Sequence, residues 1–315
     1  PMSGDSKPLV VCLVGPTAAG KTAVALHLAA RLPFEIVSVD SAMVYRHMDI
    51  GTAKPSPDVL ATAPHRLVDI LDPWETYSAG RFRQDASDEI DEIVCAGRVP
   101  LLVGGTFLYF RALQRGLAAL PPADKAVRAD IDARAAADGW PAQHARLARL
   151  DPPTAARIGP NDRQRIQRAL EVIELSGRRL SELHRTAAAR APDYEYLRLA
   201  LVPSDRGVLH ERIAQRFDRM LADGFVAEVE RLRAMEQMST ECPSMRAVGY
   251  RQLWALLEGQ IDQGEAARRA VVATRRLVKR QLTWLRGESD MAEFDCLRED
   301  VADQVLQQVA ETLRT

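Results

Sequence analysis

The feature that most restricts the fold of this chain is an octapeptide, GPTAAGKT, at residues 15–22. It directly follows the apolar run Leu9–Val14 and matches GxxxxGKT, the pattern of a loop between a strand and a helix. The glycines of such a loop let amide groups and the helix N-terminus point at one anion. Lys21 adds a positive charge, and the hydroxyl of Thr22 can bind a magnesium ion. The sequence therefore predicts a phosphate or pyrophosphate site, whereas a plain glycine turn would leave Lys21 unexplained.

Short apolar runs alternate with helical patterns along the chain, as in parallel βαβ units. We expect strands at residues 9–14, 35–39, 67–71, 99–103 and 196–202, each apolar enough to be buried on both faces. Residues 121–191 have helical periodicity and no strand-like run. These patterns predict an α/β fold, a doubly wound parallel sheet of the P-loop NTPase type, with an inserted all-helical subdomain. The catalytic core with its C-terminal helices would comprise residues 8–120 and 192–315, and the insertion residues 121–191.

Composition and charge bear on the class of protein. No apolar run approaches the roughly 20 residues that a membrane-spanning helix needs. The four cysteines are widely separated along the sequence and show none of the paired spacings of a zinc site, which favours a protein of the reducing cytoplasm. The net charge is only -1, but residues 275–286 carry five basic side chains and no acid, whereas residues 288–303 carry seven acids. The balanced total therefore hides a local basic segment.

Polar residues and glycines come at the ends of two predicted strands. Asp40 follows residues 35–39, where its carboxylate could act as a base, bind a metal or only cap a turn. Residues 104–106, Gly-Gly-Thr, follow the strand at 99–103, and two glycines allow a ligand to approach the backbone closely. This strand lacks the terminal acid of many ATPases, and the sequence has no guanine-reading NKxD motif. Ordinary hydrolysis of ATP or GTP is therefore disfavoured.

A basic stripe lies near the C-terminus on an expected helix. Its basic side carries Arg275, Arg276, Lys279, Arg280 and Trp284, and its apolar side Val271, Thr274, Val278, Leu282 and Leu285. Such a stripe fits either a solvated surface helix or a nucleic-acid surface with an aromatic residue for stacking. The stripe alone leaves both interpretations open.

Seven strings follow one another over nearly the whole chain: GPTAAGKT at 15–22, DSAMVYR at 40–46, MDIGTAKP at 48–55, GGTFLY at 104–109, RIQRALEV at 165–172, GYRQ at 249–252 and KRQLTW at 279–284. In type and order they resemble the bacterial tRNA dimethylallyltransferase, or tRNA isopentenyltransferase, family. The departures are small: Ala19, Met43 and the string PHR at 64–66 stand where Ser, Gln and a pair of His are common in that family.

The resemblance implies a transfer of the dimethylallyl group from dimethylallyl diphosphate to the exocyclic amine of an adenosine beside the anticodon in tRNA. Asp40 would accept a proton from that amine, and Thr106 would help to position the base. The loop would hold pyrophosphate instead of ATP, with Mg²⁺ bound by Thr22. The implied pyrophosphate-binding residues are Gly15, Pro16, Thr17, Ala18, Ala19, Gly20, Lys21, Thr22 and Arg216, with Arg212 as an alternative to Arg216.

The same resemblance implies that the partner is the anticodon stem-loop of tRNA, whose target adenine is flipped into a channel of the enzyme. We also expect a cytoplasmic enzyme that acts as a monomer and binds no membrane. The residues expected to touch tRNA are Asp40, Ser41, Ala42, Met43, Thr106, Arg128, Gln164, Arg165, Ile166, Gln167, Arg168, Arg246, Gly249, Tyr250, Arg251, Lys279, Arg280, Gln281, Trp284 and Arg286.

Other functions explain only parts of the sequence. A small-molecule kinase would share the phosphate loop and an arginine-rich helical lid, but it would leave residues 104–106 and the helix of Trp284 without a role. A nucleic-acid-binding protein with a vestigial loop would tolerate Lys21→Ala without loss of activity. An enzyme that prenylates free adenine nucleotides would share the chemistry. The arginine-bearing insertion and the basic helix favour a macromolecular acceptor.

Overall fold

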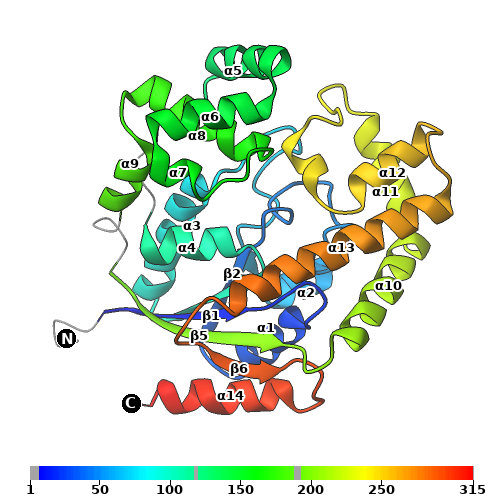
Figure 1. Ribbon diagram of the computed structural model, residues 1–315. Helices are drawn as coiled ribbons and strands as arrows, with labels where there is room; N and C mark the ends of the chain where they lie inside the picture. Colours follow the sequence, from blue (N-terminus) through cyan, green and yellow to red (C-terminus); the bar gives the residue numbers. More distant parts are fainter. Residues whose placement is uncertain (1–6, 117–119, 188–192, 315) are drawn as a thin grey trace. The chain divides into compact units, whose positions relative to one another are not determined.

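A six-stranded parallel sheet supports the first of two structural units (Figure 1). The computed structural model describes residues 7–116, 120–187 and 193–314. The strand order is β3-β2-β4-β1-β5-β6, and every pairing between neighbours is parallel. The strands are β1 (Leu9–Val14), β2 (Phe34–Val39), β3 (His65–Arg66), β4 (Val99–Gly104), β5 (Glu195–Val202) and β6 (Ala292–Asp295). The unit comprises Pro1–Phe110 and Asp193–Thr315.

The direction of winding reverses between β1 and β4. The chain passes from β1 through α1 (Lys21–Ala29) to β2 on one side, and from β4 to β5 on the other. Ligands of doubly wound sheets bind outside the carboxyl ends of the strands at such a switch point. The other helices that begin in this unit are α2 (Pro57–Thr62), α3 (Ala79–Cys95), α4 (Phe107–Arg115), α10 (Arg206–Ala222), α11 (Phe225–Arg233), the 3₁₀ helix η2 (Pro243–Arg246), α12 (Tyr250–Leu257), α13 (Gln263–Leu285) and α14 (Val301–Thr312).

Apolar side chains of β1, β2 and β4 form one core with α1 and α14. Leu13 and Leu101 from neighbouring strands pack in a cluster that includes Leu28 of α1 and Val305 and Val309 of α14. Figure 1 shows α14, in red, running beside β6 at the end of the sheet. The central strands are thus buried, as their nearly continuous apolar sequences predict.

In the second unit, Arg111–Pro192, the secondary-structure elements that the structure describes are all helices, joined by short loops. Its helix α8 begins after Asp162, whose side chain accepts a hydrogen bond from the Arg165 amide at 3.2 Å, and ends at Gly177. Ile166 and Leu170 of α8 are fully buried in the core of this unit. The other helices are α5 (Lys125–Asp138), α6 (Trp140–Leu150), α7 (Pro152–Ala155) and α9 (Leu180–Ala187), in addition to the end of α4.

The doubly wound α/β fold predicted from the sequence is confirmed, with two differences in its strands. The strand expected at residues 67–71 was wrong, because Leu67 and Asp69 adopt left-handed backbone conformations with φ of 63° and 57°. Only His65–Arg66 pairs with β2 at this edge. Strand β6 was not predicted, since its four residues, AEFD, are too short and too charged to give a strand signal.

No helix in the described part of the chain has both the length and the apolar character needed to cross a membrane. The four cysteines, all within the described residues, form no disulfide, and among them only Cys95 is exposed.

The close pairing of β4 with β2 generates a prediction about Gly104. A Cβ atom at this position would lie 2.0 Å from the carbonyl oxygen of Val39, which belongs to a buried strand and cannot move aside cheaply. We expect Gly104→Ala to lower the free energy of unfolding by about 3 kcal/mol, the upper end of the usual cost of overpacking. Urea unfolding measures this change. Gly80→Ala in α3 is the control, because its Cβ would meet only ordinary contacts. Equal midpoints for the two variants would contradict the prediction.

Candidate active site

The ends of β1, β2 and β4 meet at the switch point of the sheet. Val14 of β1 and Val39 of β2 both pair with Gly104 of β4. Beyond these strand ends, the hydroxyl of Thr106 accepts a hydrogen bond from the Ser41 amide at 3.1 Å. The structure therefore brings the phosphate loop, the turn after Asp40 and the Gly-Gly-Thr segment together at one edge.

The phosphate loop joins β1 to α1 and carries Lys21 at the first position of the helix. The Lys21 ammonium donates hydrogen bonds to the carbonyl oxygens of Gly15 and Pro16, at 3.0 and 2.7 Å. Burial lowers the pKa of Lys21 to about 8, although the carboxylate of Asp40 opposes this shift. The first amides of α1 have no partners within the helix. They leave a helix N-terminus and a cation where an anionic group can bind.

Not every residue of the loop is free to bind an anion. The amide of Thr17 donates to the side chain of Gln281 at 3.0 Å, and the amide of Ala19 points back to the carbonyl of Pro16 at 3.3 Å. Ala19 itself is buried in the core. The amides that remain for an anion are thus those nearest the start of α1.

Asp40 lies directly after β2, and its side chain caps a turn, which is one of the three roles that the sequence left open. Its Oδ1 accepts hydrogen bonds from the amides of Ala42 and Met43, at 2.8 and 3.2 Å, so the side chain caps the following turn. It also interacts electrostatically with Lys21 and with Arg216 of α10. Within the described residues both hydrogen bonds reach Oδ1, which leaves Oδ2 available to a ligand.

Arg216, rather than Arg212, belongs to this charged cluster. Burial lowers the pKa of Arg216, and the nearby carboxylate of Asp40 partly offsets the shift. Arg212, one helical turn earlier on α10, donates instead to the carbonyl oxygen of Cys296 at 3.3 Å. Two cations and one carboxylate thus meet at the switch point with a net positive charge.

Helix α13 closes one side of the site through Gln281 and Trp284. The side-chain amide of Gln281 accepts from Thr17 and donates to the carbonyl oxygen of Gly105 at 3.0 Å. Trp284 stacks on Phe107, with ring centroids 4.2 Å apart and ring planes 8° from parallel. Gln281 is buried with both amide atoms occupied, so its side chain has a structural role, and its contact with tRNA stays a prediction.

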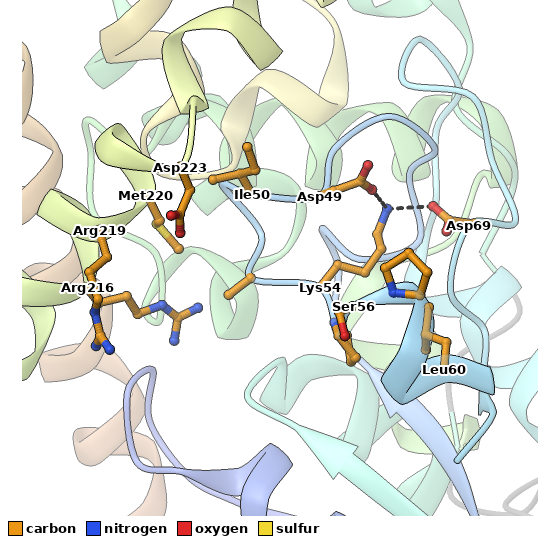
Figure 2. A pocket seen from close by; sticks show the side chains of 13 residues that line it. Asp49, Ile50, Lys54, Ser56, Leu60, Asp69, Arg216, Arg219, Met220 and Asp223 are labelled. Atoms are coloured by element: carbon orange, nitrogen blue, oxygen red, sulfur yellow. Dashed lines mark hydrogen bonds and ion pairs between the residues drawn. The ribbon is translucent and has the colours of Figure 1, made fainter. Parts of the chain in front are cut away.

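A cavity of about 480 Å³ opens beside Arg216 (Figure 2). Arg216, Arg219, Met220 and Asp223 of α10 line one side, and residues between Asp49 and Leu60, with Asp69, line the other. Figure 2 shows Arg216 and Lys54 on opposite sides of this space. The lining mixes charged groups with apolar ones, as expected of a pocket for a ligand that has both an anionic end and an apolar end.

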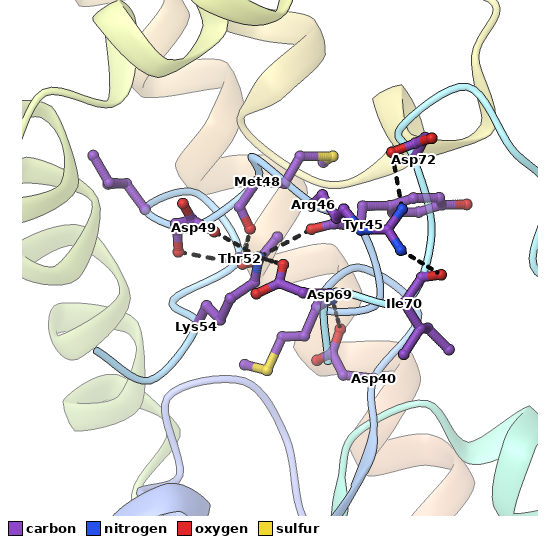
Figure 3. A network of polar contacts seen from close by, with 12 residues as sticks. Asp40, Tyr45, Arg46, Met48, Asp49, Thr52, Lys54, Asp69, Ile70 and Asp72 are labelled. Carbon is purple, nitrogen blue, oxygen red and sulfur yellow. Dashed lines mark hydrogen bonds and ion pairs between the residues drawn. The ribbon is translucent and has the colours of Figure 1, made fainter. Parts of the chain in front are cut away.

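Lys54 connects the loop that lines this cavity to the turn that follows Asp40. Its ammonium donates to the carbonyl oxygen of Tyr45 at 2.9 Å and pairs with Asp49 and Asp69, both at 2.5 Å (Figure 3). Its side chain is only 3% exposed. The sequence contributed Lys54 only as a letter in the string at 48–55, because a single lysine gives no sign of its partners.

Glu228 of α11 is a second residue of the site that sequence reasoning missed. Its carboxylate accepts hydrogen bonds from three successive amides, those of Asp49, Ile50 and Gly51, at 3.0, 2.7 and 3.2 Å. The hydroxyl of Tyr250 donates to the same carboxylate at 2.7 Å. Glu228 is 1% exposed, although a glutamate on an amphipathic helix normally indicates a solvated face. The loop at residues 48–54 is therefore fastened to α11 and α12.

The residues expected to touch tRNA divide by exposure. Exposed residues are Ser41, Arg246, Arg251, Lys279, Arg280 and Arg286 in the first unit, and Gln164 and Arg165 in the second. Partly exposed residues are Asp40, Ala42, Met43, Thr106 and Trp284, and in the second unit Arg128, Gln167 and Arg168. Buried residues are Ile166, Gly249, Tyr250 and Gln281.

Two more of these residues have fully buried side chains. Ile166 lies in the core of the second unit, so its side chain supports α8. Tyr250 is also fully buried, and burial together with Glu228 raises the pKa of its hydroxyl. Both residues serve the fold.

In the second unit, two arginines expected to contact tRNA share one carboxylate. Arg128 and Arg168 both bind the buried Glu171, with Nε–Oε1 and Nη1–Oε2 distances of 2.8 and 2.7 Å. Burial alone would raise the pKa of Glu171, but the hydrogen bonds from both guanidinium groups hold it below its ordinary value. One carboxylate between two guanidinium groups leaves one net positive charge.

The protein atoms of the site do not make a complete metal centre. Across the described residues, no group of three or more His, Cys, Asp or Glu side chains could hold a metal ion. Thr22 is the second residue of α1, directly after Lys21, which interacts with Asp40. A threonine hydroxyl at the start of this helix fits magnesium, which binds few protein ligands and completes its shell with waters and phosphate oxygens.

Comparisons with known proteins identify the family. A family model described as IPP transferase matches residues 43–288, and one described as isopentenyl transferase matches residues 8–68. The chain is 61% identical over 286 residues, covering 91% of it and 89% of the relative, to a tRNA dimethylallyltransferase of Thioalkalivibrio sulfidiphilus. It is 57% identical over 311 residues, 97% of it and 95% of the relative, to one of Burkholderia vietnamiensis.

A solved structure agrees with these relatives. The crystal structure of the full-length tRNA isopentenylpyrophosphate transferase from Bacillus halodurans superimposes with a TM-score of 0.71 at 36% identity. The match covers 98% of this chain and 97% of that one. With this sequence similarity and this fold, the chain belongs to the tRNA dimethylallyltransferase family.

Proposed function

We propose that this protein transfers the dimethylallyl group of dimethylallyl diphosphate to the exocyclic amine of an adenosine adjacent to the anticodon of tRNA, releasing diphosphate. The observation that carries the proposal is the meeting of Lys21, Arg216 and Asp40 at the switch point, next to Thr106. This arrangement offers two cations that can bind a diphosphate and one carboxylate that can accept the proton of the attacking amine. The relatives with this architecture are named as transferases and not as kinases.

The diphosphate would bind between the phosphate loop and α10. Lys21, the N-terminus of α1 and Arg216 would neutralise its charge, which grows on the departing group as the bond to carbon breaks. Thr22 and the diphosphate oxygens would hold magnesium, which supplies further neutralisation of that charge when bound. The cavity of about 480 Å³ beside Arg216 offers apolar surface from Ile50, Leu60 and Met220 to the five-carbon chain.

Asp40 is suited to take the proton from the attacking amine. As the adenosine nitrogen bonds to the first carbon of the dimethylallyl group, the bond from that carbon to oxygen breaks and its electron pair leaves with diphosphate. The proton then passes from nitrogen to Asp40, whose Oδ1 is fixed by the amides of Ala42 and Met43. Fixing one oxygen orients the other without any reorganisation during the reaction. Thr106, held by Ser41, would position the acceptor base.

The acceptor would be the anticodon stem-loop of tRNA, in which an unpaired base is flipped out at the lowest cost. Exposed Arg246, Arg251 and Arg280 in the first unit would contact its phosphates, as would Arg128 and Arg165 in the second unit. These proposed contacts involve the helical second unit as well as α13. A monomer in the cytoplasm remains the expectation from the sequence.

One experiment tests the proposal as a whole. We expect radiolabelled dimethylallyl diphosphate, magnesium and unmodified tRNA with adenosines after the anticodon to yield label on a single adenosine. Digestion to nucleosides and chromatography locate the label. ATP consumption with a metabolite acceptor, and no label in tRNA, would support a kinase and overturn the proposal.

The role of Asp40 gives a second prediction. Asp40→Asn keeps an oxygen that can cap the turn but removes the base, so turnover should fall by roughly 10² to 10⁴, the usual contribution of general acid-base catalysis. Because the loop and α13 are untouched, tRNA affinity should remain within a few-fold. Single-turnover rates and a filter-binding assay measure the two quantities. A turnover near that of the unaltered protein would remove Asp40 as the base.

The lowered pKa of Lys21 gives a third prediction. Only the protonated ammonium attracts diphosphate, and in the free enzyme its pKa is about 8. Affinity for dimethylallyl diphosphate should be constant below that pH and should fall about tenfold per unit as the pH rises above it. Calorimetric titration from pH 6.5 to 9.5 measures this. Lys21→Arg, which stays protonated throughout, should bind with no such fall. A parallel fall in both proteins would assign the titration to another group.

A further inference from the structure

The loop at residues 48–54 forms one wall of the cavity of about 480 Å³ beside Arg216, named here the donor cavity. Every residue of this loop is described by the structure, and the loop lies between β2 and α2 without being part of a strand or a helix. The loop residues that line the cavity are Asp49, Ile50, Ala53 and Lys54. Since the opposite wall belongs to α10, the distance between the walls depends on what holds the loop in place.

Glu228 connects the loop to the opposite wall. Its Oε2 accepts hydrogen bonds from the amides of Asp49 and Ile50, and its Oε1 accepts one from the amide of Gly51. Glu228 lies in the first turn of α11, only five positions after Asp223, the lining residue at the end of α10. Because so few residues separate Asp223 from Glu228, the carboxylate links the two walls and fixes the width of the donor cavity.

The carboxylate of Glu228 is itself held in one orientation. It is buried, and the hydroxyl of Tyr250 donates to its Oε1 at 2.7 Å. Phe225, three positions earlier on α11, packs its ring against that of Tyr250, with ring centroids 4.9 Å apart. The three amides and the hydroxyl together offset the cost of burying a charge. Moving the loop away would leave this buried carboxylate without partners, so the loop has one defined position.

The width of the donor cavity matters more for a hydrocarbon chain than for a diphosphate. In the proposed complex Lys21 and Arg216 bind the diphosphate, and neither residue belongs to the loop. The five-carbon chain has only van der Waals contacts with lining groups such as Ile50. Attraction of this kind loses about a quarter to a half of its strength when a gap of about 0.5–1 Å opens. A small shift of the loop would therefore weaken binding of the chain and leave binding of the diphosphate intact.

We infer that Glu228 is a positioning residue that sets the width of the donor cavity and thereby gives the protein a preference for dimethylallyl diphosphate over diphosphate alone. The inference rests on the proposed function and deepens it, because it assigns to Glu228 the part of the donor affinity that comes from the chain. Glu228 is not among the residues that line the cavity. It acts through the loop, above all through Ile50, whose amide it binds at 2.7 Å.

The test compares two substitutions on α11 that remove the same charge. In Glu228→Gln only one side-chain oxygen remains, so at least one of the three loop amides loses its acceptor. The control is Glu230→Gln, because Glu230 is exposed two positions further along the same helix. Calorimetric titration with magnesium and without tRNA measures Kd for dimethylallyl diphosphate and for inorganic pyrophosphate. Thermal unfolding checks that both variants fold.

For Glu228→Gln we expect Kd for dimethylallyl diphosphate to rise about tenfold, while Kd for pyrophosphate stays within about twofold, because the chain alone loses contact. The control should match the unaltered protein with both ligands. If Glu228 only stabilised the fold, both constants would change together, and equal changes would overturn the inference. An unchanged Kd for dimethylallyl diphosphate would also overturn it.

A milder variant covers the case in which Glu228→Gln does not fold. Tyr250→Phe removes one hydrogen bond from the carboxylate and leaves the three loop amides in place. It should raise Kd for dimethylallyl diphosphate about threefold without affecting pyrophosphate, and two unchanged constants would overturn the inference. These titrations contain no tRNA, so they are independent of the transfer reaction. Failure of the unaltered protein to label tRNA would refute the proposed function instead.

Discussion

The side-chain amide of Gln281 joins the three parts of the protein on which the site depends. It binds the Thr17 amide of the phosphate loop and the Gly105 carbonyl after β4, both at 3.0 Å, from the C-terminal part of α13. A buried polar group that loses its partner costs about 1–3 kcal/mol, so this bridge fixes the loop, the strand end and the helix against one another. The same helix carries Trp284, which stacks on Phe107. Its position would therefore govern both the proposed chemistry and the proposed approach of RNA.

The charged groups of the site leave a net positive charge that suits an anion. Lys21 and Arg216 lie near a single carboxylate, Asp40, and burial disfavours both cations, as their lowered pKa values indicate. A bound diphosphate would reverse this cost by supplying negative charge in a region of low dielectric. Two cations already held in place would need no reorganisation to receive the diphosphate of the proposed donor, a form of preorganisation that suits the departure of that group.

The wall opposite α10 depends on a residue far from the reacting groups. Glu228 gathers three consecutive amides of the loop at 49–51 and the hydroxyl of Tyr250, and Lys54 joins the same loop to Tyr45, Asp49 and Asp69. Gly51 makes this docking possible, because a Cβ atom there would lie 2.2 Å from the ring of Phe225. A carboxylate that accepts from a run of amides satisfies the backbone of an irregular loop with charge-assisted hydrogen bonds. The loop part of this cavity wall is thus held by contacts to α11 and α12 and not by pairing within a strand.

The sequence alone determined what depends on neighbours a few residues away. The glycines and Lys21 of the phosphate loop, the apolar strands and the cap and stop of α8 are local patterns, and the structure has each of them. Only the tertiary structure decided that Tyr250, Ile166 and Gln281 are buried, that Arg216 and not Arg212 faces Asp40, and that residues 67–71 are not a strand. The partners Thr17 and Gln281 are 264 positions apart. The physical reason is that burial and pairing arise where distant segments meet, and no local pattern in one sequence records which segments do.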